Sequence, residues 1–197
     1  MKENKKWLWI AFAIMVIVQI AVPAQMILKK EGIIFSGKVY KFRTAPVDPY
    51  DPFRGKYITL NFRDAEVPVS DPTVWERGME VYLTLQEDAE GFAIPKDMTA
   101  YEPSVPEDYI KAEIAWFTHD SSAVRIHYPF RKYFMEESKA LKAEKMYRES
   151  NAGKHQVYAS VGIKEGDYVL KGVMVDGIPI EEAVEQVEDN TAKSPNF

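Results

Sequence analysis

Cysteine is absent from the 197 residues of the chain, and its absence removes several kinds of chemistry at once. Without a thiol there is no disulfide framework, no lipid-modified N-terminal cysteine, no thiolate zinc site and no cysteine nucleophile. The missing thiols do not identify the compartment, because many extracytoplasmic domains also lack cysteine. Without thiols, the chain can form neither a disulfide cross-link nor a metal cross-link held by thiolates.

The chain beyond its N-terminal run also lacks an excess of positive charge. The net charge of the chain is −5, and its first 28 residues hold three lysines and one acidic residue. The rest therefore carries 22 basic and 29 acidic residues, a net charge of −7. An acidic domain without a basic stripe is poorly suited to phosphate backbones, so we expect no nucleic-acid partner.

Sequence signatures of catalysis are missing as well. The three histidines (His119, His127 and His155) are far apart, and the chain has no metalloprotease spacing, P-loop, dinucleotide fingerprint or nucleophile elbow. A membrane-anchored serine hydrolase is the least favoured alternative, because Ser36 is the one serine shortly after the apolar N-terminal run and no activating base is marked. We therefore expect no catalytic residues, no metal and no cofactor.

The longest uncharged run covers Trp7 to Leu28 and follows Lys2, Lys5 and Lys6. As a helix its 22 residues would extend about 33 Å, close to the roughly 30 Å of a bilayer core. Tryptophans near one end match the preference of indoles for the membrane interface. We expect a single transmembrane anchor over residues 7–28 in the cell membrane, in contact with lipid, with residues 1–6 in the cytoplasm.

A cleaved signal peptide is the alternative interpretation of this run. Small residues precede Gln25 in the window Val22-Pro23-Ala24, which would place cleavage after Ala24. The apolar run continues past that point and fills a complete span, which favours the anchor. Since long domains translocate largely regardless of their charge, we expect the following domain to be extracytoplasmic.

Residues 29–180 have the alternating pattern of short strands separated by turns, and we expect a mainly β, β-rich α+β domain of antiparallel hairpins. The expected strands cover residues 38–44, 56–62, 81–85, 109–117, 123–128, 155–163 and 168–175, with a further strand beginning at residue 92. Because residues 95–108 contain three prolines, we expect a loop there. Alternation within 109–117 places Trp116 on the same face as Ile110 and Ile114.

One amphipathic helix is expected in this domain, over about residues 131–149, because the segment is rich in good helix formers and lacks glycine and proline. Phe134 and Leu141 lie seven residues apart and would face the sheet together. From Glu181 the chain is acidic and lacks aromatic residues until Phe197, so we expect residues 181–197 to form a flexible, largely disordered tail.

The densest local pattern is DPYDPFRGKYITLNF, over residues 48–62. Turn chemistry accounts for its prolines, aspartates and glycine, since aspartate before proline favours a turn and its side chain can bind nearby backbone amides. The same residues also allow a binding loop, in which Asp48, Asp51 and Arg54 recognise a ligand, a cation or a protein partner. Two carboxylates are too few for a calcium site.

Three segments together resemble the GDYXXLXY family of bacterial membrane-anchored proteins. They are residues 55–62 with their Asp-Pro and Arg-Gly lead-in, the aromatic and acidic stretch 128–137, and the terminal hairpin around residues 170–177. Lys56 replaces the aspartate of the motif, Phe62 its last tyrosine, and Arg131 an expected acidic residue. The motif residues, to which a structural role is assigned, are Gly55, Tyr57, Leu60, Phe62, Tyr133, Phe134 and Glu137.

This resemblance covers nearly the whole chain and implies a membrane-anchored extracytoplasmic domain without an assigned biochemical activity. It also implies a position beside a polytopic membrane protein. We therefore expect an accessory or interaction subunit of an integral membrane protein. The alternative is an envelope ligand-binding module that uses Asp48, Asp51 and Arg54.

Overall fold

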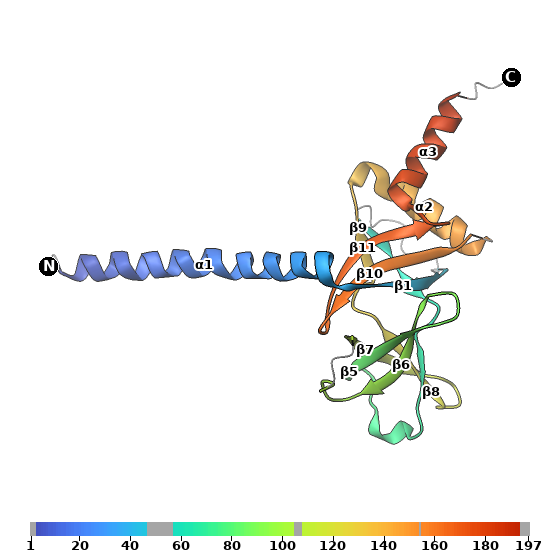
Figure 1. Ribbon diagram of the computed structural model, residues 1–197, viewed down its shortest axis with the longest axis horizontal. Coiled ribbons are helices and arrows are strands. Elements are labelled where there is room, and N and C mark those ends of the chain that lie inside the picture. Colours follow the sequence, from blue (N-terminus) through green and yellow to red (C-terminus); the bar gives the residue numbers. More distant parts are fainter. Residues whose placement is uncertain (1–2, 47–56, 105–107, 154, 194–197) are drawn as a thin grey trace.

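The computed structural model describes residues 3–46, 57–104, 108–153 and 155–193. A long N-terminal helix projects from a β-rich body that is built of two five-stranded antiparallel sheets, with two further helices at one end (Figure 1). The expected fold class, mainly β with an N-terminal apolar helix and antiparallel hairpins, is confirmed.

The N-terminal helix α1 (Glu3–Ser36) is continuous over 34 residues and contains Pro23. Its stretch Lys5–Ser36 is long and apolar enough to cross a membrane, and none of its most apolar window is buried in the protein. The helix is longer than the expected span of residues 7–28. Its last two turns extend beyond the apolar run, and Ile33 there is buried against the body.

The first sheet collects strands from both ends of the domain. Its order is β12-β11-β10-β1-β3, and β1 pairs with β10 along six residues, from Lys38 opposite Ile163 to Arg43 opposite Tyr158. The expected hairpin of β10 and β11 is present. The strands of this sheet are β1 (Lys38–Ala45), β3 (Asn61–Phe62), β10 (Val157–Lys164), β11 (Asp167–Val175) and β12 (Ile178–Pro179).

The second sheet is a local meander in the order β4-β8-β7-β5-β6. Its strands are β4 (Glu66–Pro68), β5 (Glu80–Glu87), β6 (Ala93–Thr99), β7 (Tyr109–Phe117) and β8 (Ala123–His127), and a short 3-10 helix, η1 (Pro72–Val74), follows β4. The loop expected from residue 95 is wrong as far as Thr99. Because β6 is an edge strand, Pro95 is tolerated there without interrupting the sheet.

The face expected for Trp116 is also wrong. The register between β7 and β8 shifts between Ile114 and Trp116, which marks a β-bulge. The extra residue reverses the alternation, so Ala115 is buried and Trp116 is 47% exposed. Strict alternation holds only until the bulge, and a bulge has no signature in this stretch of sequence.

The helix expected from Arg131 begins later. Lys132–Phe134 form a strand, β9, that pairs with β2 (Tyr57–Thr59), and the helix α2 spans Glu137–Ala152. Phe134 and Leu141, expected to face the sheet, are 66% and 67% exposed. Residues on the other side of α2 are buried instead, namely Ala140, Ala143, Tyr147 and Ser150. Pairing of β9 with β2 overrides the local helix propensity and turns α2 onto this face.

The disordered tail expected from Glu181 is wrong as far as Lys193, because Ile180–Lys193 form a helix, α3. Ile180 and Val184 are buried, and Lys139 of α2 pairs with Glu185. Acidic residues in its first turn also suit the positive end of the helix dipole. The composition of this segment indicated exposure to solvent. However, Ile180 and Val184 lie four residues apart on one face of α3, and this face packs beside α2.

The core lies between the two sheets and is rich in aromatic rings. Phe42 of β1 has its ring centroid 6.0 Å from Phe62, 5.1 Å from Tyr128 and 4.9 Å from Phe130. Tyr128 and Phe130 stack with an interplanar angle of 15°. All four rings are at most 4% exposed, and such pairs contribute beyond simple area burial.

Candidate functional site

The three segments that carry the family resemblance come together in the fold. The first and second are joined by the pairing of β2 with β9 and by a hydrogen bond of 2.8 Å from the Leu60 amide to the Arg131 carbonyl. The terminal hairpin joins them through Tyr168, whose hydroxyl donates to the Pro129 carbonyl at 3.2 Å. Its ring lies 5.5 Å from that of Phe130. Segments far apart in sequence therefore meet at the boundary of the two sheets.

The motif residues have different environments there. Leu60 and Phe62 are buried in the core. The rings of Tyr57 and Phe134 lie 5.3 Å apart at the partly exposed end of the β2–β9 pair. Tyr133 donates its hydroxyl to Glu181, which ties β9 to α3.

Glu137 begins α2 in its acidic first turn. Gly55 and the proposed binding residues Asp48, Asp51 and Arg54 lie outside the described residues, so the structure places neither that glycine nor the binding loop.

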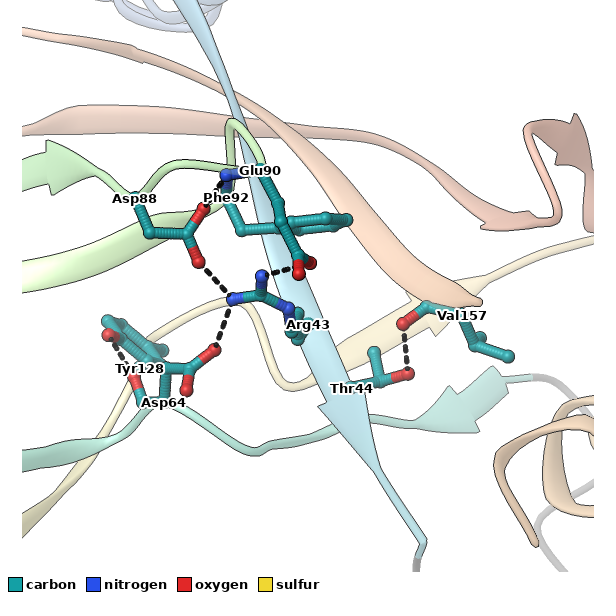
Figure 2. A network of polar contacts seen from close by, with 8 residues as sticks. All are labelled: Arg43, Thr44, Asp64, Asp88, Glu90, Phe92, Tyr128 and Val157. Carbon is teal, nitrogen blue, oxygen red and sulfur yellow. Dashed lines mark hydrogen bonds and ion pairs between the residues drawn. The ribbon is translucent and has the colours of Figure 1, made fainter. Parts of the chain in front are cut away.

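A polar network around Arg43 connects the two sheets (Figure 2). Its guanidinium contacts Asp88 at 2.5 Å, Glu90 at 2.8 Å and Asp64 at 3.3 Å, and lies 4.0 Å from the ring centre of Phe92. Arg43 belongs to β1 in the first sheet. Asp88 and Glu90 belong to the turn between β5 and β6 in the second, and the cation therefore bridges the two.

The Asp88 side chain is held in place by backbone amides of its own turn as well as by Arg43. Its other carboxylate oxygen accepts the backbone amides of Glu90 and Phe92, each at 2.9 Å. The bond from Phe92, followed by the contact with Arg43, holds the pKa of Asp88 below its usual value, although burial opposes this effect. This cluster was not expected from the sequence. Apart from Asp64, the side chains that contact the Arg43 guanidinium lie 45 or more positions away from it along the chain.

Histidines and carboxylates do not assemble into a catalytic group in the described ranges. His119 lies in the turn after β7, and His155 contacts Asp176 at 2.6 Å on the surface. His127 lies in an open polar cleft of about 400 Å³ together with residues of both charges, among them Lys111, Glu113 and Arg131. Partial burial, helped by Arg131, lowers the pKa of His127. No group of three metal-binding side chains is found among these residues.

The candidate functional site is the junction at which α1 meets the β10–β11 hairpin, because this junction orients the body relative to the apolar helix. Ile33 of α1 is 2% exposed. Two lysines at the end of the apolar run, Lys29 and Lys30, contact Asp167 at 2.5 and 3.5 Å. Lys30 also donates to the Tyr168 carbonyl at 3.0 Å.

The hairpin in turn supplies cations to the end of the helix. The last turn of α1 contains no basic residue. Lys171 donates to the Ile34 carbonyl at 2.9 Å, and Lys164 donates to the Ser36 hydroxyl at 3.0 Å. Cations at this position complement the unpaired carbonyls and the negative end of the helix dipole. The sequence does not signal this role of Lys164, because Ser36 is 128 residues away from it along the chain.

The charged form of Asp167 is stabilised by its two lysine partners. Partial burial disfavours its charged form, but the hydrogen bonds and charges of Lys29 and Lys30 keep its pKa below the usual value. Gly37 permits the close approach that follows the helix, since a Cβ there would lie 2.5 Å from the Ile33 carbonyl oxygen. The junction can fix an orientation, and it contains no groups arranged for bond cleavage.

Comparisons with known proteins agree with the resemblance seen in the sequence. The family model described as GDYXXLXY protein matches residues 19–173. No curated protein and no solved structure matches the chain. The matched range begins in the second half of α1 and includes strands β1 to β10 and most of β11. It therefore includes the junction between α1 and the β10–β11 hairpin.

Replacing the central cation of the network tests its role in holding the sheets together. Arg43→Met keeps an aliphatic contact with Phe92 but leaves three carboxylates facing one another, so we expect the free energy of unfolding at pH 7 to fall by about 1–3 kcal/mol. The pKa of Asp88 is depressed in the folded protein, so the stability it contributes is present above its unfolded pKa and is lost as the pH falls through its folded pKa.

The difference between the denaturation curves of the two proteins should therefore persist at pH 4 and shrink only as the pH falls to about 2, below the lowered pKa of Asp88. Arg63→Met is the matched control, because Arg63 is exposed and its side chain has no hydrogen bond or ion pair among the described residues. It should change stability by less than about 0.5 kcal/mol. A deficit in Arg43→Met that persists unchanged at about pH 2 would contradict the electrostatic explanation.

Two glycines at the junction offer a matched pair of substitutions. Gly37→Ala pushes a methyl group into the Ile33 carbonyl, whereas a Cβ at Gly32 meets nothing within 4 Å. We expect Gly37→Ala to lower the melting temperature and to speed amide exchange over residues 33–37. Gly32→Ala should leave both unchanged or raise stability slightly, since alanine favours a helix by about 0.5–1 kcal/mol over glycine. Equal behaviour of the two variants would refute a tight junction.

Proposed function

The chain belongs to the GDYXXLXY family, and from this membership and the geometry of α1 we propose that it is a membrane-anchored accessory subunit whose extracytoplasmic body docks on an integral membrane protein. The observation that carries the proposal is a pair of residues in the middle of the apolar run, Gln19 and Pro23. The rigid junction supports it by giving the body one orientation above the membrane.

Gln19 lies within two residues of the centre of the run from Trp7 to Leu28. Its side-chain amide would be in the hydrocarbon, where polar groups are costly and characteristically face other protein. Pro23 adds a second unsatisfied group, because it has no N–H to donate to the Gln19 carbonyl four residues earlier. Backbone groups freed in this way are satisfied in membranes by neighbouring helices, side chains or water.

The same face of α1 leads to the body. Lys30 follows Gln19 by eleven residues, or about three helical turns, and Ile33 follows by about four. Both contact the hairpin, Lys30 through the Tyr168 carbonyl and Ile33 by burial. A partner helix that hydrogen-bonds to Gln19 would therefore lie beneath the body, where helix and body can be contacted together.

Photo-cross-linking in living cells tests this arrangement. A photoreactive residue at position 15, which replaces the exposed Met15 one turn before Gln19 on the same face, should capture an integral membrane protein. The same residue at position 17 should capture much less of it. Ile17 has nearly the same depth, lies on the opposite face and is 65% exposed. Gln19→Leu should weaken reciprocal co-purification about three- to thirtyfold, as expected for an interhelical hydrogen bond of about 0.6–2 kcal/mol, while Ile17→Leu should not.

Equal capture at both positions would count against the proposal. So would capture of nothing but lipid or of a second copy of this chain at position 15.

The absence of cysteine makes the topology directly testable. Ser70→Cys introduces a single thiol at an exposed position of the body, and Lys5→Cys introduces one before the apolar run. A membrane-impermeant maleimide should label position 70 in intact cells and position 5 only after lysis. The reverse pattern would refute the extracytoplasmic placement. Loss of residues 1–24 from the mature protein would instead identify a cleaved signal peptide.

A further inference from the structure

A cleft of about 240 Å³ opens between α1 and the turn of the β10–β11 hairpin. It is lined by Leu28, Lys29, Gly32, Ile33, Lys164, Glu165 and Asp167. Its volume is below the roughly 300 Å³ at which pockets for drug-sized ligands begin. The cleft therefore suits a small polar group rather than a whole metabolite.

The position of the cleft along α1 sets its depth. If Trp7–Leu28 fill the hydrocarbon core, Leu28 marks its outer edge, and Ile33 lies about 7.5 Å beyond it at 1.5 Å per residue. The polar layer on each side of a bilayer is about 5–7.5 Å thick, the difference between a core of roughly 30 Å and a total of 40–45 Å. The cleft thus lies at the level of the lipid headgroups.

Two lysines and two carboxylates line the cleft, and Lys30 and Lys171 adjoin it through their contacts with Asp167 and the Ile34 carbonyl. Asp167 is already shared by Lys29 and Lys30, so these three residues carry one surplus positive charge. Lys164 and Lys171 bond to the Ser36 hydroxyl and the Ile34 carbonyl, and neither pairs with a carboxylate in the part of the chain that the structure describes. With Glu165 counted, the four lysines and two carboxylates in and beside the cleft carry a net charge of +2, in contrast with the acidic body.

The walls of the cleft differ in polarity. Leu28 is 68% exposed at the membrane side. At Gly32 the helix surface is open, since an added Cβ would meet no atom within 4 Å. Lys164 and Glu165 form the opposite, polar wall from the hairpin turn. An occupant with a charged head and an apolar continuation toward the bilayer matches both walls.

We propose that this cleft binds the headgroup of a membrane phospholipid, with Lys164 and Lys29 contacting the phosphate diester. The inference rests on the membrane anchoring of the proposed function. Glu165 lies in the same cleft as the lysines, and its carboxylate suits the ammonium of an ethanolamine headgroup. Phosphate recognition is common to all phospholipids, while Glu165 favours ethanolamine over glycerol.

Native mass spectrometry of the full chain in detergent tests this site directly. Phosphatidylethanolamine and phosphatidylglycerol with identical acyl chains are titrated separately onto the delipidated protein. We expect one lipid to be retained, with ethanolamine preferred. Lys164→Gln should weaken retention of both lipids about tenfold or more, since a charged hydrogen bond is lost. Lys145→Gln, which changes an exposed lysine on α2, should retain lipid as the original chain does.

Two variants separate lipid binding from the integrity of the junction. Gly32→Leu fills the open cleft while every lysine contact remains, so it should abolish retention without lowering the melting temperature. Glu165→Gln should reduce the preference for ethanolamine and leave phosphatidylglycerol bound at least as tightly. Retention of both lipids to the same extent, lost in Lys164→Gln and Gly32→Leu, would support recognition of the phosphate alone.

The site is refuted if Gly32→Leu and Lys164→Gln retain lipid as well as the original chain does. Partner capture from position 15 is measured in the same variants and keeps the two proposals separate. Lipid retention without partner capture would refute the accessory function and support the headgroup site. Partner capture with unchanged lipid retention in both cleft variants would do the opposite.

Discussion

The contact between the end of α1 and the β10–β11 hairpin is the constraint on which the arrangement of this protein depends. A helix long enough to cross a membrane ends with unpaired carbonyls and no basic residue in its last turn. Lysines of the hairpin supply the missing cations, and burial of Ile33 holds the two elements together. Because Gly37 allows β1 to begin immediately afterwards, the helix and the first sheet are joined without a flexible linker.

The body depends on a second kind of long-range contact. Phe42, Phe62, Tyr128 and Phe130 fill the space between the sheets, and Arg43 joins their edges through carboxylates from the other sheet. The segments that resemble the family motif supply three of these rings. The motif can therefore keep its structural role although Lys56 replaces its aspartate, because the described motif residues Leu60 and Phe62 act by packing.

The junction and the core together suggest how the proposed functions fit one molecule. The headgroup cleft lies between two elements that are already fixed to each other, so a bound lipid would meet a preformed site at little cost in ordering. Gln19 and Pro23 lie on the face of α1 that leads to the same hairpin. A partner helix, a lipid headgroup and the body would then be neighbours along one side of α1.

By itself the sequence determined the features that depend on neighbours along the chain. An uncharged run specifies the long apolar helix because length and polarity are local, and alternation with turn residues specifies the hairpins β5–β6, β7–β8 and β10–β11. Tertiary structure decided everything that depends on distant partners. Pairing of β9 with β2 replaced the start of the predicted helix and left Phe134 exposed, and α3 formed because α2 lies beside Ile180 and Val184. The ion pairs of Arg43 and the contacts of the lysines at the end of α1 also depend on tertiary structure. The sequence shows which side chains are charged, but only the fold determines which of them lie close together.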